Sequence, residues 1–134
     1  MIEKNVKLID AENAILGRLA SYVAKQALKG EEIVIVNSEK AIITGNRKNI
    51  QKEFLETRGR VGSGQEGPKV SRVADKILKR SIRGMLEHRH KRGKDALKRI
   101  RCYVGIPKEF ESSKKITAGK EKPIKFISIK EISK

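Results

Sequence analysis

The sequence predicts an α/β protein whose first strands run parallel in one sheet. A strand, a helix and a second strand follow one another between residues 6 and 36, and this order is typical of a right-handed βαβ unit. The length of 134 residues favours a single domain over 1–134, large enough to bury about two thirds of the surface of its unfolded chain. Hydrophobic residues make up 37% of the chain, which is too many for a disordered tail.

The βαβ unit begins with a short strand at Val6–Asp10. Apolar residues then recur at the spacing of one helix face at positions 16, 19, 20, 23, 24, 27 and 28, which predicts an amphipathic helix. Gly30 is a good stop for this helix. The β-branched run Ile33–Val36 predicts a strand that is covered on both faces.

A second short apolar run, Ala41–Thr44, ends at Gly45. Asn46 is a candidate cap for a helix that ends at Gly59. The segment 59–68 holds four glycines and a proline, so we expect an exposed loop there. The apolar residues of the helix before this loop are Ile50, Phe54 and Leu55.

The best-patterned helix is predicted over Ser71–Leu86. Its cations recur at i, i+4, i+7, i+8 and i+11 and form one stripe, with Asp75 nearby to offset them. Like charges on one stripe repel one another, which favours a partner that neutralises them. The cations are Arg72, Lys76, Lys79, Arg80 and Arg83, and the apolar face carries Val73, Ala74, Ile77, Leu78, Ile82, Met85 and Leu86.

A short helix is predicted around Lys94–Arg101. Cys102–Ile106 then reads as a final core strand that Pro107 closes. The tail over 109–134 is rich in lysine and loosely patterned, and Ser128–Glu131 is a candidate capping box for one last turn of helix. The residues of the short helix that we expect to face inward are Ala96, Leu97 and Ile100.

The positive charge of the chain lies mainly in one segment. There are 32 Lys and Arg residues against 16 Asp and Glu, a formal net charge of +16. Residues 1–55 carry a net charge of +2, residues 56–101 of +10 and residues 102–134 of +4. Only two arginines lie outside 58–101, and arginine presents a planar fork that suits phosphate oxygens. The segment 58–101 is therefore the predicted contact surface for a polyanion.

Folded nucleic acid is the favoured polyanion. A helix on a membrane surface would carry bulky aromatic residues, whereas the helix over 71–86 has an aliphatic face and the chain has no tryptophan. Aromatic residues make up only 4% of the chain, so platforms that stack single-stranded bases have little support. We expect binding to the phosphates of a largely double-stranded nucleic acid. No apolar run reaches the length of a membrane span, and the N-terminus lacks the apolar region of a signal peptide.

Two motifs of the basic segment invite other interpretations. The G-x-G-x-x-G string at 62–67 follows a predicted helix instead of a strand, so it does not fit a dinucleotide site, and we expect no cofactor. His88 and His90 are spaced like a metal-binding pair, but they lie among cations. Polyanion contact is therefore favoured over a metal for both histidines.

Carboxylates near the ends of the predicted strands raise the question of catalysis. Asp10, Glu12 and Glu39 lie where α/β enzymes often place their chemistry, but no nucleophile pairs with them. Helix caps and surface ion pairs explain them better, and a small RNA-processing or RNA-modifying enzyme stays the alternative to a binding protein. Cys102, the single cysteine, excludes zinc fingers and fits a small buried residue in a reducing cytoplasm.

Two groups of motifs resemble one protein family over residues 6–107. Arg83–Leu86, a following Gly93 and the run Ala96–Pro107 resemble the signature of the universal large-subunit ribosomal protein thirteen family, in its archaeal and eukaryotic branch. Glu87 departs from the family pattern, which usually has proline or a small residue there. The N-terminal half matches the same family through Ile9–Ala11, Leu16–Ser21, Val36–Ala41 and Thr44–Asn46.

The resemblance implies a three-layer α/β/α fold around a small, mainly parallel, Rossmann-like sheet of about four strands, with basic loops and a C-terminal extension. It implies a non-enzymatic protein of the large ribosomal subunit in the cytoplasm, which binds folded 23S-type rRNA, joins early in assembly and touches neighbouring ribosomal proteins. Neither a metal nor a small-molecule substrate is expected. Gly84 would allow close packing or an approach of the backbone to RNA. With the charge pattern, the candidate rRNA-binding residues are Arg58, Arg60, Arg72, Lys76, Lys79, Arg80, Arg83, Gly84, His88, Arg89, His90, Lys91, Arg92, Lys94, Lys98 and Arg101.

Overall fold

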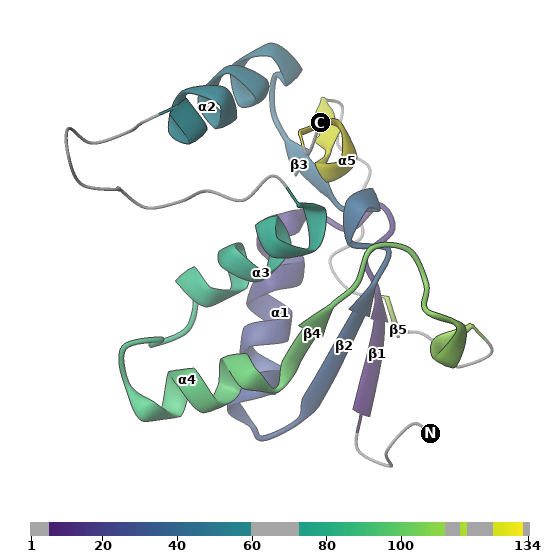
Figure 1. Ribbon diagram of the computed structural model, residues 1–134, viewed down its shortest axis with the longest axis vertical. Coiled ribbons are helices and arrows are strands. Elements are labelled where there is room, and N and C mark those ends of the chain that lie inside the picture. Colours follow the sequence, from purple (N-terminus) through teal and green to yellow (C-terminus); the bar gives the residue numbers. More distant parts are fainter. Residues whose placement is uncertain (1–5, 60–72, 112–115, 118–124, 133–134) are drawn as a thin grey trace.

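The computed structural model describes residues 6–59, 73–111, 116–117 and 125–132. Two sheets organise these residues (Figure 1). The larger sheet has four strands in the order β4-β2-β1-β5, and the smaller sheet pairs β3 with β6. The α/β class and the small, mainly parallel sheet are thereby confirmed.

The larger sheet is built from parallel pairs. β1 (Val6–Asp10) lies between β2 (Glu32–Val36) and β5 (Ile116–Thr117), and β2 also pairs with β4 (Ile100–Cys102). α1 (Leu16–Leu28) connects β1 to β2, so the predicted βαβ unit is confirmed.

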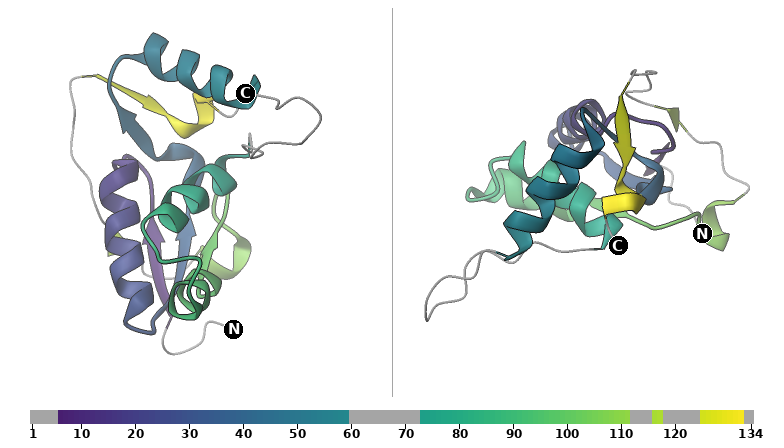
Figure 2. Two further views of the ribbon diagram at one scale, coloured as in Figure 1. Left: turned by 90° about the vertical axis from the view of Figure 1, so that its left-hand side faces the viewer. Right: turned by 90° about the horizontal axis from the view of Figure 1, so that it is seen from above.

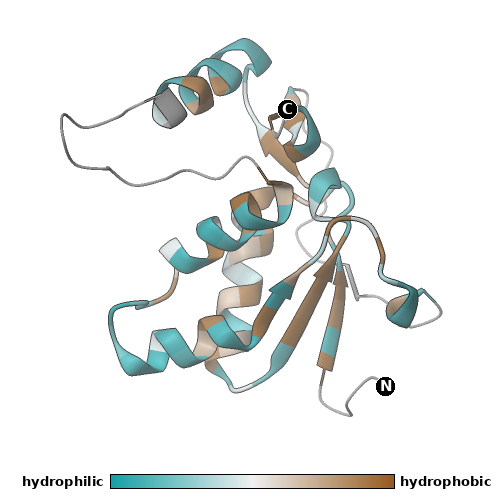
Figure 3. Ribbon diagram, viewed as in Figure 1, coloured by the Kyte–Doolittle hydropathy of each residue, from teal (hydrophilic) through white to brown (hydrophobic). Residues whose placement is uncertain are grey.

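Three helices cover one face of the larger sheet (Figures 1 and 2). They are α1, α3 (Ala74–Gly84) and α4 (Lys91–Lys98), and α1 contacts both of the others. Because side chains alternate along a strand, every second residue of β1, β2 and β4 points into the main core beneath these helices. In Figure 3 the strands are mainly hydrophobic and α4 is mainly hydrophilic. The largest fully buried residues of this core include Ile9, Leu19, Ile33, Ile35, Leu78, Ile82 and Ile100.

The opposite face of the sheet carries a second, smaller core under the 3-10 turn η2 (Lys108–Phe110). The rings of Tyr103 and Phe110 lie 6.1 Å apart between centroids and are tilted by 42°. β2 is thus covered on both faces, as its β-branched run predicts. In the described part of the chain, the three-layer arrangement therefore has one thick helical layer and one thin layer. The buried residues of the smaller core are Leu8, Val34, Val36 and Phe110.

The smaller sheet extends the molecule beyond the end of the larger one (Figure 1). β3 (Ile42–Thr44) and β6 (Phe126–Ser128) run antiparallel, and α5 (Ile129–Ile132) follows β6 directly. The predicted last turn of helix is confirmed as α5. The predicted loop over 59–68 lies outside the described residues, apart from Gly59.

α2 (Arg47–Gly59) leads away from β3, and its start and end match the prediction. The Lys48 backbone N–H donates to Oδ1 of Asn46 at 3.0 Å, so Asn46 acts as the predicted cap. Leu55 is 63% exposed, whereas Phe54 packs against the main core. The apolar face of α2 is therefore narrower than predicted.

α3 is shorter than the predicted helix over Ser71–Leu86. Val73 has an extended backbone and forms the N-terminal cap, while Met85 lies just beyond the last turn. Each is 48% exposed, so the expectation that both belong to the buried face is wrong. α4 begins at Lys91, ahead of the predicted start at Lys94.

The final strand is also displaced from its prediction. β4 begins at Ile100, which pairs with Ile33 of β2 and is fully buried, so neither a helix through Arg101 nor a strand over Cys102–Ile106 is correct. The chain leaves the sheet soon after, because Gly105 (φ +71°) turns it onto the loop beyond β2. Val104 and Ile106 are left exposed, at 55% and 38%.

Candidate nucleic-acid interface

The cations of α3 lie on the outer side of the helix. Lys76, Arg80 and Arg83 are exposed and Lys79 is half-buried, so the predicted stripe is confirmed for its described members. Arg72, its first member, lies outside the described residues. The helix can hold this stripe because its opposite side is anchored in the core by Ala74, Ile77, Leu78 and Ile82.

A tight turn over 85–90 joins α3 to α4 and brings their cations close together. The His88 backbone N–H donates to the Leu86 carbonyl at 2.8 Å, and the His90 backbone N–H donates to the Glu87 carbonyl at 3.0 Å. His90 then caps α4 with an extended backbone. The exposed basic residues of this turn and of α4 are Arg89, His90, Lys91, Arg92, Lys94 and Lys98.

Gly93 allows this turn to pack against α4. It is buried, and a Cβ added there would overlap the carbonyl group of Glu87. Only a residue without a side chain permits so close an approach. Gly93 is absent from the predicted site, although a glycine beside a cluster of cations at a helix start is a recognisable signal. Glu87, the departure from the family pattern, thus supplies the backbone on which the turn closes.

Two members of the predicted set have different surroundings from the exposed cations. Gly84 is exposed, and a Cβ added there would meet nothing within 4 Å. The predicted close packing at Gly84 is therefore wrong for the described structure. The other predicted role of Gly84, an approach of its backbone to RNA, stays a prediction. His88 is half-buried, and its Nδ1 is a buried atom with no hydrogen-bond partner among the described residues.

The structure separates Arg101 from the other cations. Arg101 lies opposite Val34 in the sheet, and paired residues of adjacent strands point to the same face. Val34 belongs to the smaller core, so Arg101 lies on the face of the sheet away from α3 and α4. Arg58 lies near the end of α2, with its side chain outside the described part of the structure, as is all of Arg60.

The carboxylates at the strand ends have structural partners. Oδ1 of Asp10 accepts hydrogen bonds from the Glu12 backbone N–H and from Nδ2 of Asn37, both at 3.0 Å. The carboxylate of Glu39 accepts the Gly105 backbone N–H at 2.9 Å. These contacts fix loops instead of capping helices, and they give the carboxylates of Asp10 and Glu39 structural partners near the carboxyl ends of β1 and β2.

Cys102 is unsuited to nucleophilic chemistry. Its side chain packs against the main core from the end of β4, and burial raises the pKa of the thiol to about 12. The reactive thiolate is therefore scarce near neutral pH. Within the described residues, no three His, Cys, Asp or Glu side chains are grouped to hold a metal ion. No helix in the described ranges is long and apolar enough to cross a membrane.

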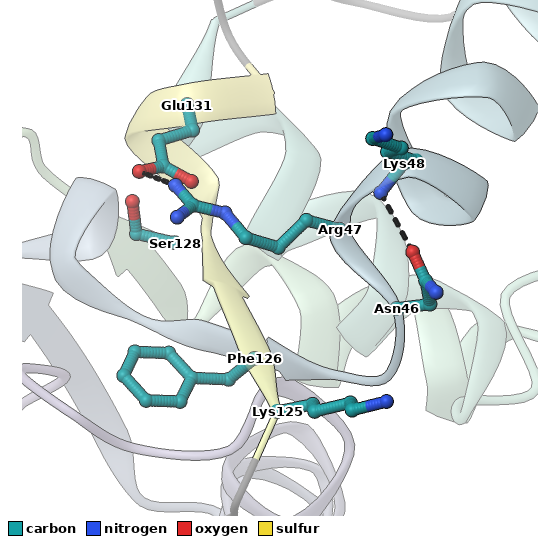
Figure 4. Close-up of a pocket in the computed structure, with 7 residues that line it drawn as sticks. All are labelled: Asn46, Arg47, Lys48, Lys125, Phe126, Ser128 and Glu131. Carbon is teal, nitrogen blue, oxygen red and sulfur yellow. Dashed lines mark hydrogen bonds and ion pairs between the residues drawn. The ribbon is translucent and has the colours of Figure 1, made fainter.

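Cations outside the predicted segment also gather at one place. A hollow between the start of α2 and β6 is lined by Arg47, Lys48 and Lys125 together with Phe126 (Figure 4). This group was not predicted from the sequence, because Lys125 is far from Arg47 and Lys48 along the chain. The pairing of β3 with β6 brings them together.

These features define a class of protein: an α/β scaffold that presents cations on a helical surface and has no catalytic set in its described residues. The family model for ribosomal protein L13 matches residues 4–109. The chain belongs to the ribosomal protein L13 family. As a member of a family of ribosomal proteins, it is not an enzyme.

Several relatives are similar over most of the chain. A protein of Methanosarcina barkeri named large ribosomal subunit protein uL13 is 54% identical over 82% of this chain and 79% of its own length. The protein of the same name from Methanocaldococcus jannaschii is 48% identical over 95% of this chain and 94% of its own. The protein of the same name from Thermoplasma volcanium is 45% identical over 96% of this chain and 96% of its own length. The archaeal side of the predicted resemblance is confirmed.

Proposed function

We propose that this chain is a structural protein of the large ribosomal subunit that binds folded rRNA mainly through phosphates and assists early assembly. The observation that carries the proposal is the cationic surface of α3, the turn and α4. Between residues 73 and 98 there are nine Lys and Arg residues against three Asp and Glu. A duplex backbone presents closely spaced phosphates that neutralise such a surface, whereas in solvent the cations repel one another.

The scaffold holds this surface in a fixed shape. Both helices are packed on α1 and the sheet, and Gly93 fixes the turn between them. Because the cations are positioned before RNA arrives, binding costs little ordering of the backbone. Folded rRNA would then be recognised by the spacing of its phosphates, with little dependence on base sequence.

The remaining partners and the location follow from the same proposal. The protein works in the cytoplasm as part of the ribosome, in keeping with the names of its relatives. Neighbouring large-subunit proteins are a second class of partner. The exposed Val104 and Ile106 after β4 offer them an apolar contact, since such residues at a surface are common at protein interfaces.

The salt dependence of rRNA binding tests the phosphate mechanism. If 6–10 phosphates are contacted, affinity falls by about 10³–10⁵ between 50 and 200 mM salt. Filter binding of the full chain to a transcript of archaeal large-subunit rRNA measures this slope. An affinity that hardly changes with salt would refute the mechanism.

A triple variant tests the placement of the surface. Replacing Arg89, Lys91 and Arg92 by alanine removes three exposed cations, and we expect rRNA affinity to fall by roughly 10- to 100-fold at moderate salt. The matched control replaces three exposed lysines elsewhere, Lys25, Lys29 and Lys40, and changes the net charge equally. Equal losses in the two variants would show that charge acts without regard to place.

Association with the subunit tests the role in the ribosome. The protein should co-sediment with large subunits after a high-salt wash, because a structural component is held by many contacts at once. A protein that is found only free of the large subunits would refute this role.

A further inference from the structure

The hollow at the start of α2 has the features that recognise an unstacked nucleotide. It lies between β6 and the first turn of α2, outside the basic segment 58–101, and has a volume of about 640 Å³ (Figure 4). Its lining combines one aromatic ring with charged and polar groups. The lining residues besides Phe126 are Asn46, Arg47, Lys48, Lys125, Ser128 and Glu131.

Phe126 is exposed to an unusual degree for a phenylalanine. It is 45% exposed, whereas a phenylalanine ring in a folded protein is normally buried. It is also the exception in this chain, whose aromatic residues all lie in the described part. The four others, which are buried or half-buried, are Tyr22, Phe54, Tyr103 and Phe110.

The backbone that carries Phe126 is fixed. Phe126 pairs with Thr44 across the antiparallel β3–β6 ribbon, and the next residue, Ile127, is 1% exposed. The Gly45 backbone N–H donates to the Lys125 carbonyl at 3.0 Å and holds the end of the ribbon. Because Ile127 anchors one face of the ribbon in the core, Phe126 is directed to the other face. The ring is thus presented by rigid structure.

The charges that line the hollow favour an anion. Three cations and one carboxylate line the hollow, and the carboxylate of Glu131 accepts a hydrogen bond from the guanidinium group of Arg47. This pair holds the Arg47 side chain across the hollow, above the ring of Phe126 in the view of Figure 4. Lys48 and Lys125 lie on the other side of β6 from the ring in Figure 4 and add two ammonium groups, which suit phosphate oxygens as point charges.

We propose that this hollow binds a single unstacked nucleotide of the large-subunit rRNA. The base stacks on Phe126 on one side of β6, and the adjoining phosphate backbone passes the end of β6 to reach Lys48 and Lys125 on its other side. The proposal rests on rRNA being the partner, as the proposed function states, and adds a base contact to the phosphate contacts of α3 and α4. Because every base has a π-face, the site selects a base that is turned out of its helix, with little preference for its identity.

Substitutions of Phe126 test the stacking contact. In the full chain, F126A should weaken binding to a transcript of Methanocaldococcus jannaschii large-subunit rRNA by about 5- to 150-fold, the usual effect of removing one stacked base. F126Y keeps the ring and should bind nearly as the unchanged protein does. F126L keeps apolar bulk without a π-face and should behave like F126A. Circular dichroism checks that each variant folds.

Chemical probing of the bound rRNA locates the nucleotide. One base that the unchanged protein protects should become reactive with F126A and be protected again with F126Y. Replacing Lys48 and Lys125 together by alanine should lower the slope of log affinity against log salt by about 1.4–1.8. The matched control, K25A with K29A, removes two exposed lysines from the end of α1 and should leave the protected base unchanged.

The outcomes separate this inference from the function on which it rests. If F126A binds and protects rRNA as the unchanged protein does, while the triple variant of Arg89, Lys91 and Arg92 is weakened, the nucleotide site is refuted and the proposed function stands. If the unchanged protein fails to bind rRNA, the proposed function itself fails. A photo-crosslinking residue at position 126 that links to a ribosomal protein in assembled subunits, and not to rRNA, assigns the hollow to a protein partner and overturns the inference.

Discussion

The N-terminal βαβ unit and the segment from α3 to α4 use their residues in opposite ways. In the βαβ unit, the strands are buried on both faces and the polar groups at their ends bond one another, as Asp10 and Asn37 do. In the α3–α4 segment, one side of each helix is buried and the other side carries cations. The net charge follows this division, with +2 over residues 1–55 and +10 over residues 56–101.

If the cationic surface binds rRNA as proposed, stability and binding are located in separate parts of one domain. In the described part of the chain, the βαβ unit supplies 13 of the 26 buried hydrophobic residues, and residues 56–101 carry +10 of the net charge of +16. The two functions meet where α3 packs on α1, because the helix that presents the cations is also one wall of the core. Substitutions on either side of this boundary should therefore change one property and leave the other.

The largest effect on stability is expected from Ile35 in β2, which is fully buried. I35A leaves a cavity in a packed core, and we expect the free energy of unfolding to fall by about 2–5 kcal/mol. Thermal or urea unfolding measures this loss. The salt slope of rRNA binding, measured where the variant is still folded, should match that of the unchanged protein.

I35V is the control for this prediction, because it removes one methylene and should cost about 0.5–1.5 kcal/mol. A changed salt slope in folded I35A would contradict the separation, since it would mean that the core position also sets the phosphate contacts.

The βαβ unit was predictable from sequence because its signals are local. The helical spacing of α1, the stop at Gly30 and the β-branched run of β2 each depend on neighbours along the chain, and all three are confirmed. The position of β4 was not predictable in this way. Its start at Ile100 is decided by pairing with Ile33, and no pattern within residues 94–106 shows which register brings the most apolar area into the core.

The next largest effect is expected at Gly93, where a substitution should change both the stability of the fold and the affinity for rRNA. Alanine normally stabilises a helix relative to glycine. At this position its Cβ would overlap the Glu87 carbonyl, so we expect G93A to lower the free energy of unfolding by about 1–3 kcal/mol. Because relief of the overlap must displace the turn over 85–90, rRNA affinity should fall as well. Unfolding curves and filter binding on the same preparations measure both changes.

A stable G93A with unchanged affinity would show that the turn relaxes at no cost and that its position does not matter for RNA. The triple variant of Arg89, Lys91 and Arg92 is the matched comparison, because it should lose rRNA affinity without a change in its unfolding curve.

The candidate site was predictable only in part, because some of its residues are placed by strand pairing between distant parts of the chain. The stripe on α3 follows from helical spacing within one element. Of its described members, Lys76, Arg80 and Arg83 are exposed as expected, and Lys79 is half-buried. Arg101 was assigned by charge alone, although strand alternation places it on the opposite face of the sheet from α3. The group around Phe126 depends on a strand pairing between residues far apart in sequence, which composition and charge counting do not reveal.

The smallest effect is expected at Gly84. There a substitution should change the free energy of unfolding and the rRNA affinity in opposite directions. Gly84 is the last residue of α3, its φ is not positive, and a Cβ would meet nothing within 4 Å. G84A should therefore raise the free energy of unfolding by about 0.4–1 kcal/mol, since alanine restricts the unfolded chain more than glycine does.

If the backbone at Gly84 approaches RNA, the added methyl group must weaken rRNA binding while the protein becomes more stable. Unfolding and filter binding measured on G84A would show the two quantities moving in opposite directions. If stability rises and affinity is unchanged, Gly84 has no place in the interface, and the contact surface is made by the side chains of the cations alone.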